Sequence, residues 1–270
     1  QAWGGVPGEL LETDRTFNPY TYENEVDDYL QTHYQAHYTR DFGKGFNLNV
    51  ALFYTHGEGF FEQFREQDAL EDYGLENVTI GDSTIYTTDL IRRRWLDNDF
   101  YGGTFSTNYD RGGKISATLG GAISQYKGKH FGEVIWAQYA SNGDIRHRYY
   151  DNDATKADFN IFARFNYAIT GGLSAFADMQ IRRVDYEFFG LDNAGDGALQ
   201  SDALTFFNPK LGLNWSFNSG NRLYFSYARG NKEPNRNDYT ESSPNSWPKH
   251  ETLDDFELGY QRSSRIYTFS

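Results

Sequence analysis

The chain has 270 residues and a formal net charge of −13. This acidic balance argues against nucleic acid as a partner, because phosphates are bound through Lys and Arg. The absence of Cys excludes disulfides and thiolate metal sites. No segment reaches the roughly 18 consecutive apolar residues of a membrane-spanning helix, so any role in a membrane would have to use strands.

Aromatic residues are unusually frequent: 21 Tyr, 22 Phe and 5 Trp make up 18% of a chain that is only 38% hydrophobic. Transmembrane barrels carry such rings in girdles at both bilayer interfaces. The composition therefore favours a membrane barrel. The first four residues read as the middle of a loop and the last six as the start of a strand, so we expect further sequence at both ends.

Alternation of apolar and polar residues with a period of two dominates the chain and predicts strands. In chain order these cover residues 29–39, 46–54, 101–109, 115–124, 159–167, 173–182, 207–217, 223–227 and 253–260. A tenth strand begins at Arg265. The apolar sides that contain Leu48, Val50, Leu52 and Leu211, Leu213, Trp215 are expected to face lipid.

The predicted connections alternate between two lengths. Short turns rich in Gly and Asn lie at residues 41–45, 110–113, 170–172 and 218–221, and long polar connections of roughly 20 to 40 residues lie between them. Membrane barrels sort their connections in this way, with short periplasmic turns and long extracellular loops. Rings also mark the predicted strand ends: Tyr34, Tyr38, Tyr54, Tyr101, Tyr109, Tyr167, Trp215 and Tyr260.

Several motifs carry a family resemblance. They are Leu90–Gly103 (LIRRRWLDNDFYGG), His147–Asp153 (HRYYDND), Phe207–Lys210 (FNPK), Asn231–Tyr239 (NKEPNRNDY), Pro248–Glu251 (PKHE) and Asp255–Tyr260 (DFELGY). In this order they resemble TonB-dependent outer-membrane receptors, in particular iron-complex receptors of the Bacteroidetes type, over essentially the whole chain.

The resemblance implies that this chain is the central portion of an all-β, antiparallel transmembrane β-barrel, about ten strands of a barrel of about 22. It further implies a multi-pass protein of the bacterial outer membrane that takes up a scarce nutrient, with a ferric siderophore as the expected ligand. The expected partners are the receptor's own plug domain, the remaining barrel strands, outer-membrane lipid, and the TonB complex, which acts through the plug rather than through this segment. Residues 1–270 would all belong to the barrel domain.

The polar sides of the predicted strands are expected to face the lumen and the plug. They carry His33, His37, Arg164, Asp178, Arg182 and Lys210. His33 and His37 lie about 13 Å apart along one strand, too far for one metal ion. Because an unpaired desolvated charge is costly, the charged residues are expected to pair with the plug or with one another. A direct contact with ligand is the alternative.

The predicted loop over residues 127–153 concentrates rings and cations: Trp136, Tyr139, Arg146, His147, Arg148 and Tyr149. Rings offer flat contact area and Arg binds anionic groups, so these residues are candidate ligand contacts for an anionic aromatic ligand such as a ferric catecholate. The alternative is that they fold the loop onto itself. A second predicted loop over residues 56–94 combines rings with carboxylates.

No pattern indicates catalysis, a cofactor or a metal site. Asp151, Asn152 and Asp153 lack the glycine and the distal glutamate of an EF-hand loop. Nothing resembles a nucleophile with its base or a phosphate-binding loop, so we expect no enzyme activity. Two other functions remain open: a passive porin-like barrel, and a secreted all-β carbohydrate-binding or hydrolase domain.

Overall fold

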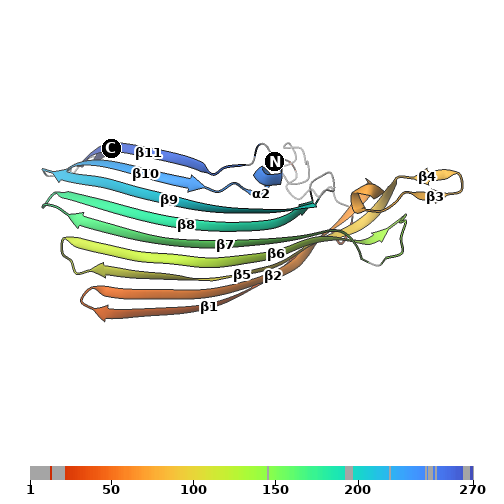
Figure 1. Cartoon of the computed structure of the whole chain (residues 1–270), viewed down its shortest axis with the longest axis horizontal. Helices are drawn as coiled ribbons and strands as arrows, with labels where there is room; N and C mark the ends of the chain where they lie inside the picture. Colours follow the sequence, from red (N-terminus) through yellow and green to blue (C-terminus); the bar gives the residue numbers. More distant parts are fainter. Residues whose placement is uncertain are drawn as a thin grey trace. The chain divides into compact units, whose positions relative to one another are not determined.

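The computed structural model describes residues 13, 22–144, 146–191, 197–218, 220–240, 242, 246, 248–263 and 268–269. A ten-stranded sheet follows chain order, β1-β2-β5-β6-β7-β8-β9-β10-β11-β12 (Figure 1). Its strands are β1 Asp27–Gly43, β2 Phe46–Ala69, β5 Thr87–Asp110, β6 Ile115–Ala137, β7 His147–Ala168, β8 Leu173–Leu191, β9 Gly197–Phe217, β10 Asn221–Lys232, β11 Glu251–Ser263 and β12 Thr268–Phe269. The predicted all-β fold, with nine strands and the start of a tenth, is confirmed.

The remaining elements are short. A separate hairpin pairs β3 Val78–Ile80 with β4 Ser83–Ile85, and the described residues from Tyr22 onward include the helical elements η1 Leu70–Tyr73 and α2 Arg236–Thr240. Of the residues described, none belongs to a helix long and apolar enough to cross a membrane.

The prediction of long loops over residues 56–94 and 127–153 was wrong in its extent. β2 continues to Ala69 and β5 begins at Thr87, while β6 continues to Ala137 and β7 begins at His147. A bilayer crossing uses only about 9–11 residues of a strand, whereas β2 has 24. Beyond the apolar stretch neither side of a strand needs to be apolar, so the period-two signal disappears although backbone pairing continues.

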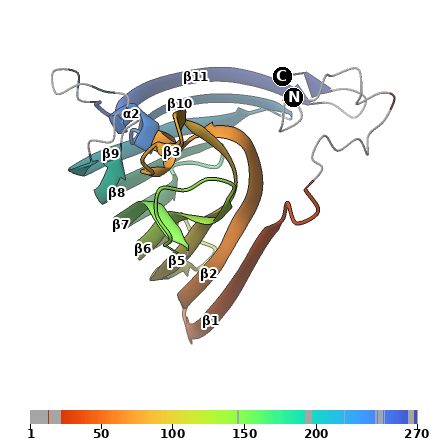
Figure 2. The ribbon, with the colours of Figure 1, turned by 90° about the vertical axis from the view of Figure 1, so that its right-hand side faces the viewer.

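The chain divides into two compact units. The first contains Gly57–Asp97 and Lys129–Asp151 together with the described residues up to Leu30. The second contains Gln31–His56, Asn98–Gly128 and Asn152 onward. Its strands follow an arc from β1 to β11 in Figure 2.

One side of the sheet in the second unit is apolar and exposed. On β9, Leu211 pairs with Ala177 of β8 and Tyr227 of β10, and Leu213 pairs with Ala175 and Phe225. The large apolar side chains exposed on these strands include Leu52, Ile123, Phe159, Ile181, Phe207, Leu211, Leu213, Trp215 and Leu258. Rings contact one another in pairs such as Phe46 with Tyr109 and Trp215 with Phe217. This side has the composition expected of a lipid-facing wall.

The opposite, polar side is tied together by hydrogen bonds between neighbouring strands. Thr39 donates to Asn49 at 3.1 Å and Thr118 donates to Asn108 at 2.8 Å. Rings on this side cover glycines of the next strand: a Cβ on Gly212 would lie 2.2 Å from the Phe176 ring. Gly259 and Gly120 are covered in the same way by Tyr224 and Phe162 respectively. Only glycine leaves room for a ring to lie this close to the wall.

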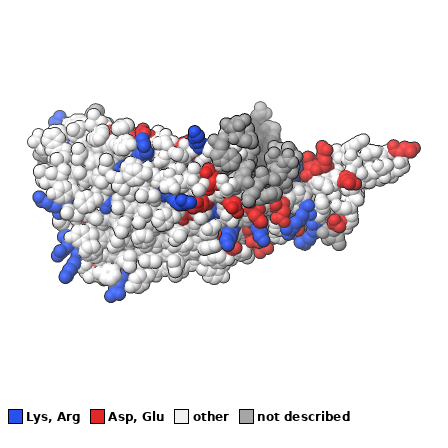
Figure 3. Space-filling model, viewed as in Figure 1, with Lys and Arg blue, Asp and Glu red and all other residues white. Residues whose placement is uncertain are grey.

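The short turns use the residues that tight hairpins require. Asp41 accepts a hydrogen bond from the Gly43 amide at 2.7 Å, and Asp110 accepts one from the Gly112 amide at 2.7 Å. Gly43 and Gly112 have φ of 73° and 69°, in the left-handed region. Lys and Arg gather at this turn end of the strands, on the left of Figure 3.

Candidate functional site

The first unit has its own hydrophobic core, formed where η1 packs between strands. Leu70, Tyr73, Leu75, Leu90 and Val134 are buried together. The Tyr73 hydroxyl donates to Asp68 at 2.6 Å and accepts from Arg92 at 3.1 Å. Burial and the bond to Asp68 raise the pKa of Tyr73 well above its usual range. The first part of the connection between β2 and β5, from Leu70 to Leu75, is therefore packed against the strands, whereas Ile80 of the β3–β4 hairpin is exposed.

Three of the six residues predicted to contact ligand help to hold this unit together. His147 lies with Nε2 2.8 Å from the Tyr73 carbonyl oxygen, and the Tyr149 ring meets the Tyr73 ring edge-on at 4.8 Å. Burial raises the pKa of Tyr149. The backbone amide of Tyr139 donates to the Thr88 hydroxyl at 2.9 Å. These contacts give His147, Tyr149 and Tyr139 a structural part in positioning their neighbours.

The other three predicted contact residues expose much of their side chains. Trp136 is 48% exposed, and the side chains of Arg146 and Arg148 are 56% and 50% exposed. Each arginine lies 3.9 Å from a carboxylate oxygen of Glu133, and Arg148 also contacts Asp151 at 2.7 Å. The structure thus separates Trp136, Arg146 and Arg148, which are accessible, from His147 and Tyr149, whose side chains contact Tyr73, while Tyr139 is engaged through its backbone amide.

Arg148 ends a row of side chains in contact with one another that crosses four strands, which we call the arginine–aromatic row. Neighbouring members lie 4.0 to 5.8 Å apart. In order the members are Arg93, Phe60, Trp95, Phe131 and Arg148. Cations stack favourably on ring faces, and the Trp95 indole donates to Glu133 at 3.1 Å. Sequence reasoning missed the row because its members come together only through the pairing register of β2, β5, β6 and β7.

Glu62 anchors the segment before β1 to the first unit. Its side chain is only 1% exposed and accepts hydrogen bonds from the Tyr22 hydroxyl, the Asn24 amide and Arg93 Nε at 2.5 to 2.7 Å. Burial by itself would raise the pKa of Glu62, but these three hydrogen bonds outweigh it and hold the pKa below its usual value. The ionised carboxylate is therefore the form that ties the three partners together.

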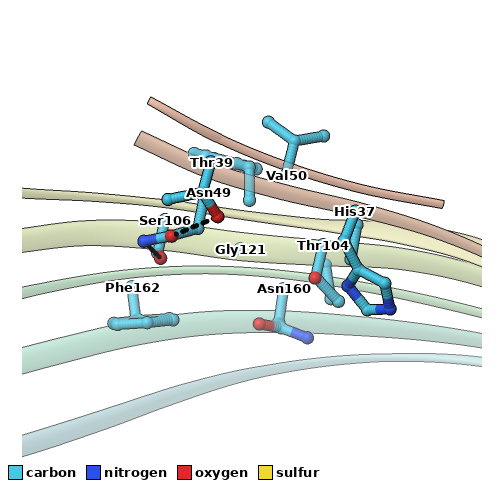
Figure 4. Close-up of a pocket in the computed structure, with 12 residues that line it drawn as sticks. His37, Thr39, Asn49, Val50, Thr104, Ser106, Gly121, Asn160 and Phe162 are labelled. Atoms are coloured by element: carbon cyan, nitrogen blue, oxygen red, sulfur yellow. Dashed lines mark hydrogen bonds between the residues drawn. The ribbon is translucent and has the colours of Figure 1, made fainter. Parts of the chain in front are cut away.

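The predicted lumen residues lie on the polar side of the second unit. His37 lines a hollow of about 400 Å³ with Thr39, Asn49, Ser106 and Asn160, and in Figure 4 Val50 points away from them. His33 approaches the Thr55 hydroxyl at 3.0 Å. The described residues include no group of three or more His, Asp or Glu side chains that could hold a metal ion.

The charged members of the predicted set lie on adjoining strands. Asp178 pairs in register with Arg164 on one side and Lys210 on the other, and Arg164 NH2 lies 2.8 Å from Asp178. Arg182 binds Asp158 through Nε at 2.9 Å and NH2 at 2.5 Å. Both arginines therefore have a carboxylate partner within the wall itself.

The motif over Asn231–Tyr239 forms a connection that returns to the sheet. Asn231 donates to Asn208 of the FNPK motif at 2.8 Å. Asn235 and Asp238 exchange backbone-to-side-chain hydrogen bonds at 2.7 and 3.2 Å, the reciprocal arrangement of a capping box at the start of α2.

The end of this motif is buried. Tyr239 is 2% exposed, donates to Asp202 at 2.6 Å and lies against the rings of Tyr186 and Phe188. Burial and the bond to Asp202 raise the pKa of Tyr239 well above its usual range. The motif therefore forms a short segment whose last residue, Tyr239, is fixed by burial and by its hydrogen bond to Asp202.

The chain is similar in fold to several solved structures that are distant from it in sequence. The copper transporter OprC is 10% identical with a TM-score of 0.63, and the match covers 87% of this chain and 38% of that one. The siderophore receptor PiuA from Acinetobacter baumannii is 13% identical with a TM-score of 0.55, covering 88% and 38%. The ferric-catecholate import receptor Fiu from E. coli K12, in its closed form, is 9% identical with a TM-score of 0.51, covering 87% and 38%.

The chain spans about 38% of the length of these proteins. No curated protein matches it. A family model described as "TonB dependent receptor-like, beta-barrel" matches residues 3–270. This family is a class of receptors and transporters rather than of enzymes. The alternating sides, the hairpin turns and this match agree: the chain belongs to the TonB-dependent receptor-like β-barrel family.

Proposed function

We propose that the chain forms wall and ligand-capturing parts of an outer-membrane receptor that imports a ferric siderophore, with import energised through TonB. The observation that carries the ligand class is the accessible end of the arginine–aromatic row. There, Arg148 stacks on Phe131 at 4.0 Å and exposes half of its side chain, beside Arg146. Flat rings next to two guanidinium groups suit an anionic aromatic ligand such as a ferric catecholate.

The predicted contact residues take two roles in this proposal. Trp136, Arg146 and Arg148 contact the ligand, because they are accessible. His147, Tyr149 and Tyr139 position them, because their polar atoms or rings are engaged inside the first unit.

The membrane location rests on the apolar side of the second unit. Its exposed Leu, Ile, Phe and Trp side chains would be costly in water over so large a contiguous area and are the composition of a lipid-facing wall. The polar side is proposed to meet the receptor's plug domain, with His33, His37, Arg164, Asp178, Arg182 and Lys210 lining the interface. Energy from TonB would reach the receptor through that plug.

Ligand capture is tested by binding of ferric enterobactin, a tris-catecholate complex, to the whole receptor in detergent. We expect Arg146→Ala and Arg148→Ala each to weaken binding about tenfold, the effect of losing about 1.4 kcal/mol. Arg183→Ala is the matched control, because Arg183 is an exposed arginine paired with Asp185 in the second unit. Protease sensitivity of residues 138–146 reports whether the connection stays folded.

Unchanged affinity in both arginine variants, with the connection intact, would contradict the proposed contact site. Uptake of the same complex by cells lacking TonB separates the energised receptor from a passive porin-like barrel. We expect uptake to stop without TonB, whereas a porin-like barrel would continue to pass the ligand.

A further inference from the structure

A second cationic site lies on the polar side of the second unit, away from the arginine–aromatic row in sequence. Lys156 of β7 and Arg182 of β8 both bind Glu233 Oε1: the Lys156 ammonium group is hydrogen-bonded to it, and Arg182 NH2 lies 3.4 Å from it. Asp158 binds Arg182 from within the sheet. Four charged groups from three segments therefore meet at one point.

The two carboxylates of this site are held differently. Asp158 belongs to β7, which pairs with β8 in continuous register from Ala154 to Ala168. Glu233 lies outside any strand, directly after β10 ends at Lys232. Movement of the Glu233 backbone away from the cations breaks no strand pairing, whereas movement of the Asp158 backbone would break the pairing of β7 with β8.

Departure of Glu233 would change the net charge of this cluster. With Glu233 in place, two cations face two carboxylates. Without it, Lys156, Arg182 and Asp158 carry one net positive charge. The side chains of Lys156 and Arg182 are 33% and 26% exposed, so the site can be reached, yet it is screened from water enough for the charge to attract an anion more strongly than at a free surface.

We propose that Lys156 and Arg182 form a binding site for a carboxylate of a small anionic ligand, and that Glu233 fills this site while the ligand is absent. Glu233 thus acts as an internal mimic of the ligand. Its displacement frees the residues between β10 and α2, while Tyr239 continues to hold α2 through its hydrogen bond to Asp202. The proposal rests on the proposed function only in taking the carboxylate to belong to the imported molecule.

The test measures binding of citrate, a tricarboxylate probe, to the whole receptor in detergent by titration calorimetry. Glu233→Gln keeps the shape of the side chain and removes the competing charge, so we expect it to bind citrate about tenfold more tightly than the unchanged receptor. Adding Lys156→Met to Glu233→Gln should abolish the gain. Glu251→Gln is the control, because Glu251 is an exposed carboxylate that pairs with Lys232, and we expect it to leave citrate affinity unchanged.

Hydrogen exchange of residues 233–240 supplies a second readout. In the unchanged receptor citrate should speed exchange there, and in Glu233→Gln exchange should be fast without citrate. Equal citrate affinity in the unchanged receptor and Glu233→Gln, including no binding by either, would overturn the proposal. So would a gain that survives Lys156→Met. Because binding is measured on purified protein, a gain in Glu233→Gln stands even if ferric catecholate uptake fails, and would then point to a carboxylate-bearing ligand in place of a ferric catecholate.

Discussion

Placing an arginine on the apolar side of β9 tests whether this side faces lipid. Leu211 and Leu213 are 41% and 49% exposed on the same side as Trp215. Leu211 lies midway between Phe207 and Trp215, about 13 Å along the strand from each. Leu211 is therefore the residue nearest the middle of the stretch bounded by Phe207 and Trp215.

The cost of the arginine depends on this depth. At the middle of a bilayer an arginine on the lipid side of a barrel costs about 2–4 kcal/mol, and near the interface about 0–1 kcal/mol. Leu213 lies two residues, or about 7 Å of strand, nearer one end. We therefore expect Leu211→Arg to lower the free energy of unfolding by roughly 2–4 kcal/mol and Leu213→Arg to lower it by less.

The assay is denaturant unfolding of the whole receptor refolded into lipid vesicles, followed by tryptophan fluorescence. Asn166→Arg is the matched control, because Asn166 is exposed on the polar side of β7 and bonds Ser116. If Leu211→Arg costs no more than Asn166→Arg, or less than Leu213→Arg, the assignment of this side to the bilayer is refuted.

Three further changes test packing, charge and capping. Gly212→Val should destabilise the receptor by about 1–3 kcal/mol, because the new side chain collides with the Phe176 ring; unfolding in denaturant measures it, and an unchanged midpoint would contradict it. The pKa of Glu62 is lowered on folding, so its stabilisation is present above the ordinary glutamate pKa of about 4.3 and is lost as pH falls through the lower folded value. A dye on Glu23→Cys should therefore gain mobility in acid, measured by anisotropy, and a pH-independent signal would refute this. Asn235→Ala should cost about 1 kcal/mol of α2 stability, seen as faster hydrogen exchange over residues 236–240, whereas unchanged exchange would show that the cap contributes little.

The strand segments that the sequence predicted best are those with one apolar side and one polar side. Residues 207–217 alternate cleanly because one side of β9 is apolar and the other carries Asn208, Lys210 and Asn214. Residues 197–206 belong to the same strand but alternate poorly, since no lipid constrains them. The same reasoning explains why β2, β5, β6 and β7 were predicted too short.

The candidate site was predicted only in part, for a different reason. Local crowding of rings and cations drew attention to Trp136, Arg146 and Arg148, and the structure leaves these accessible. Local crowding carries no information about partners far away in sequence, such as Tyr73 for His147. The stacking of Trp95 on Phe131 likewise depends on strand register, which one sequence does not specify.

The pairing of β8 with β9 has a consequence for how the receptor's sequence can change. From Leu173 opposite Trp215 to Leu191 opposite Gly197, the two strands stay in one uninterrupted register. Loss of a single residue from β8 ahead of Ile181 would turn every side chain beyond it to the other side, carrying Arg182 to the apolar side and Ile181 to the polar side. Insertions and deletions within β8 and β9 therefore keep each side chain on its side only when they add or remove two residues. A single residue can be added or removed only where a β-bulge accommodates the change.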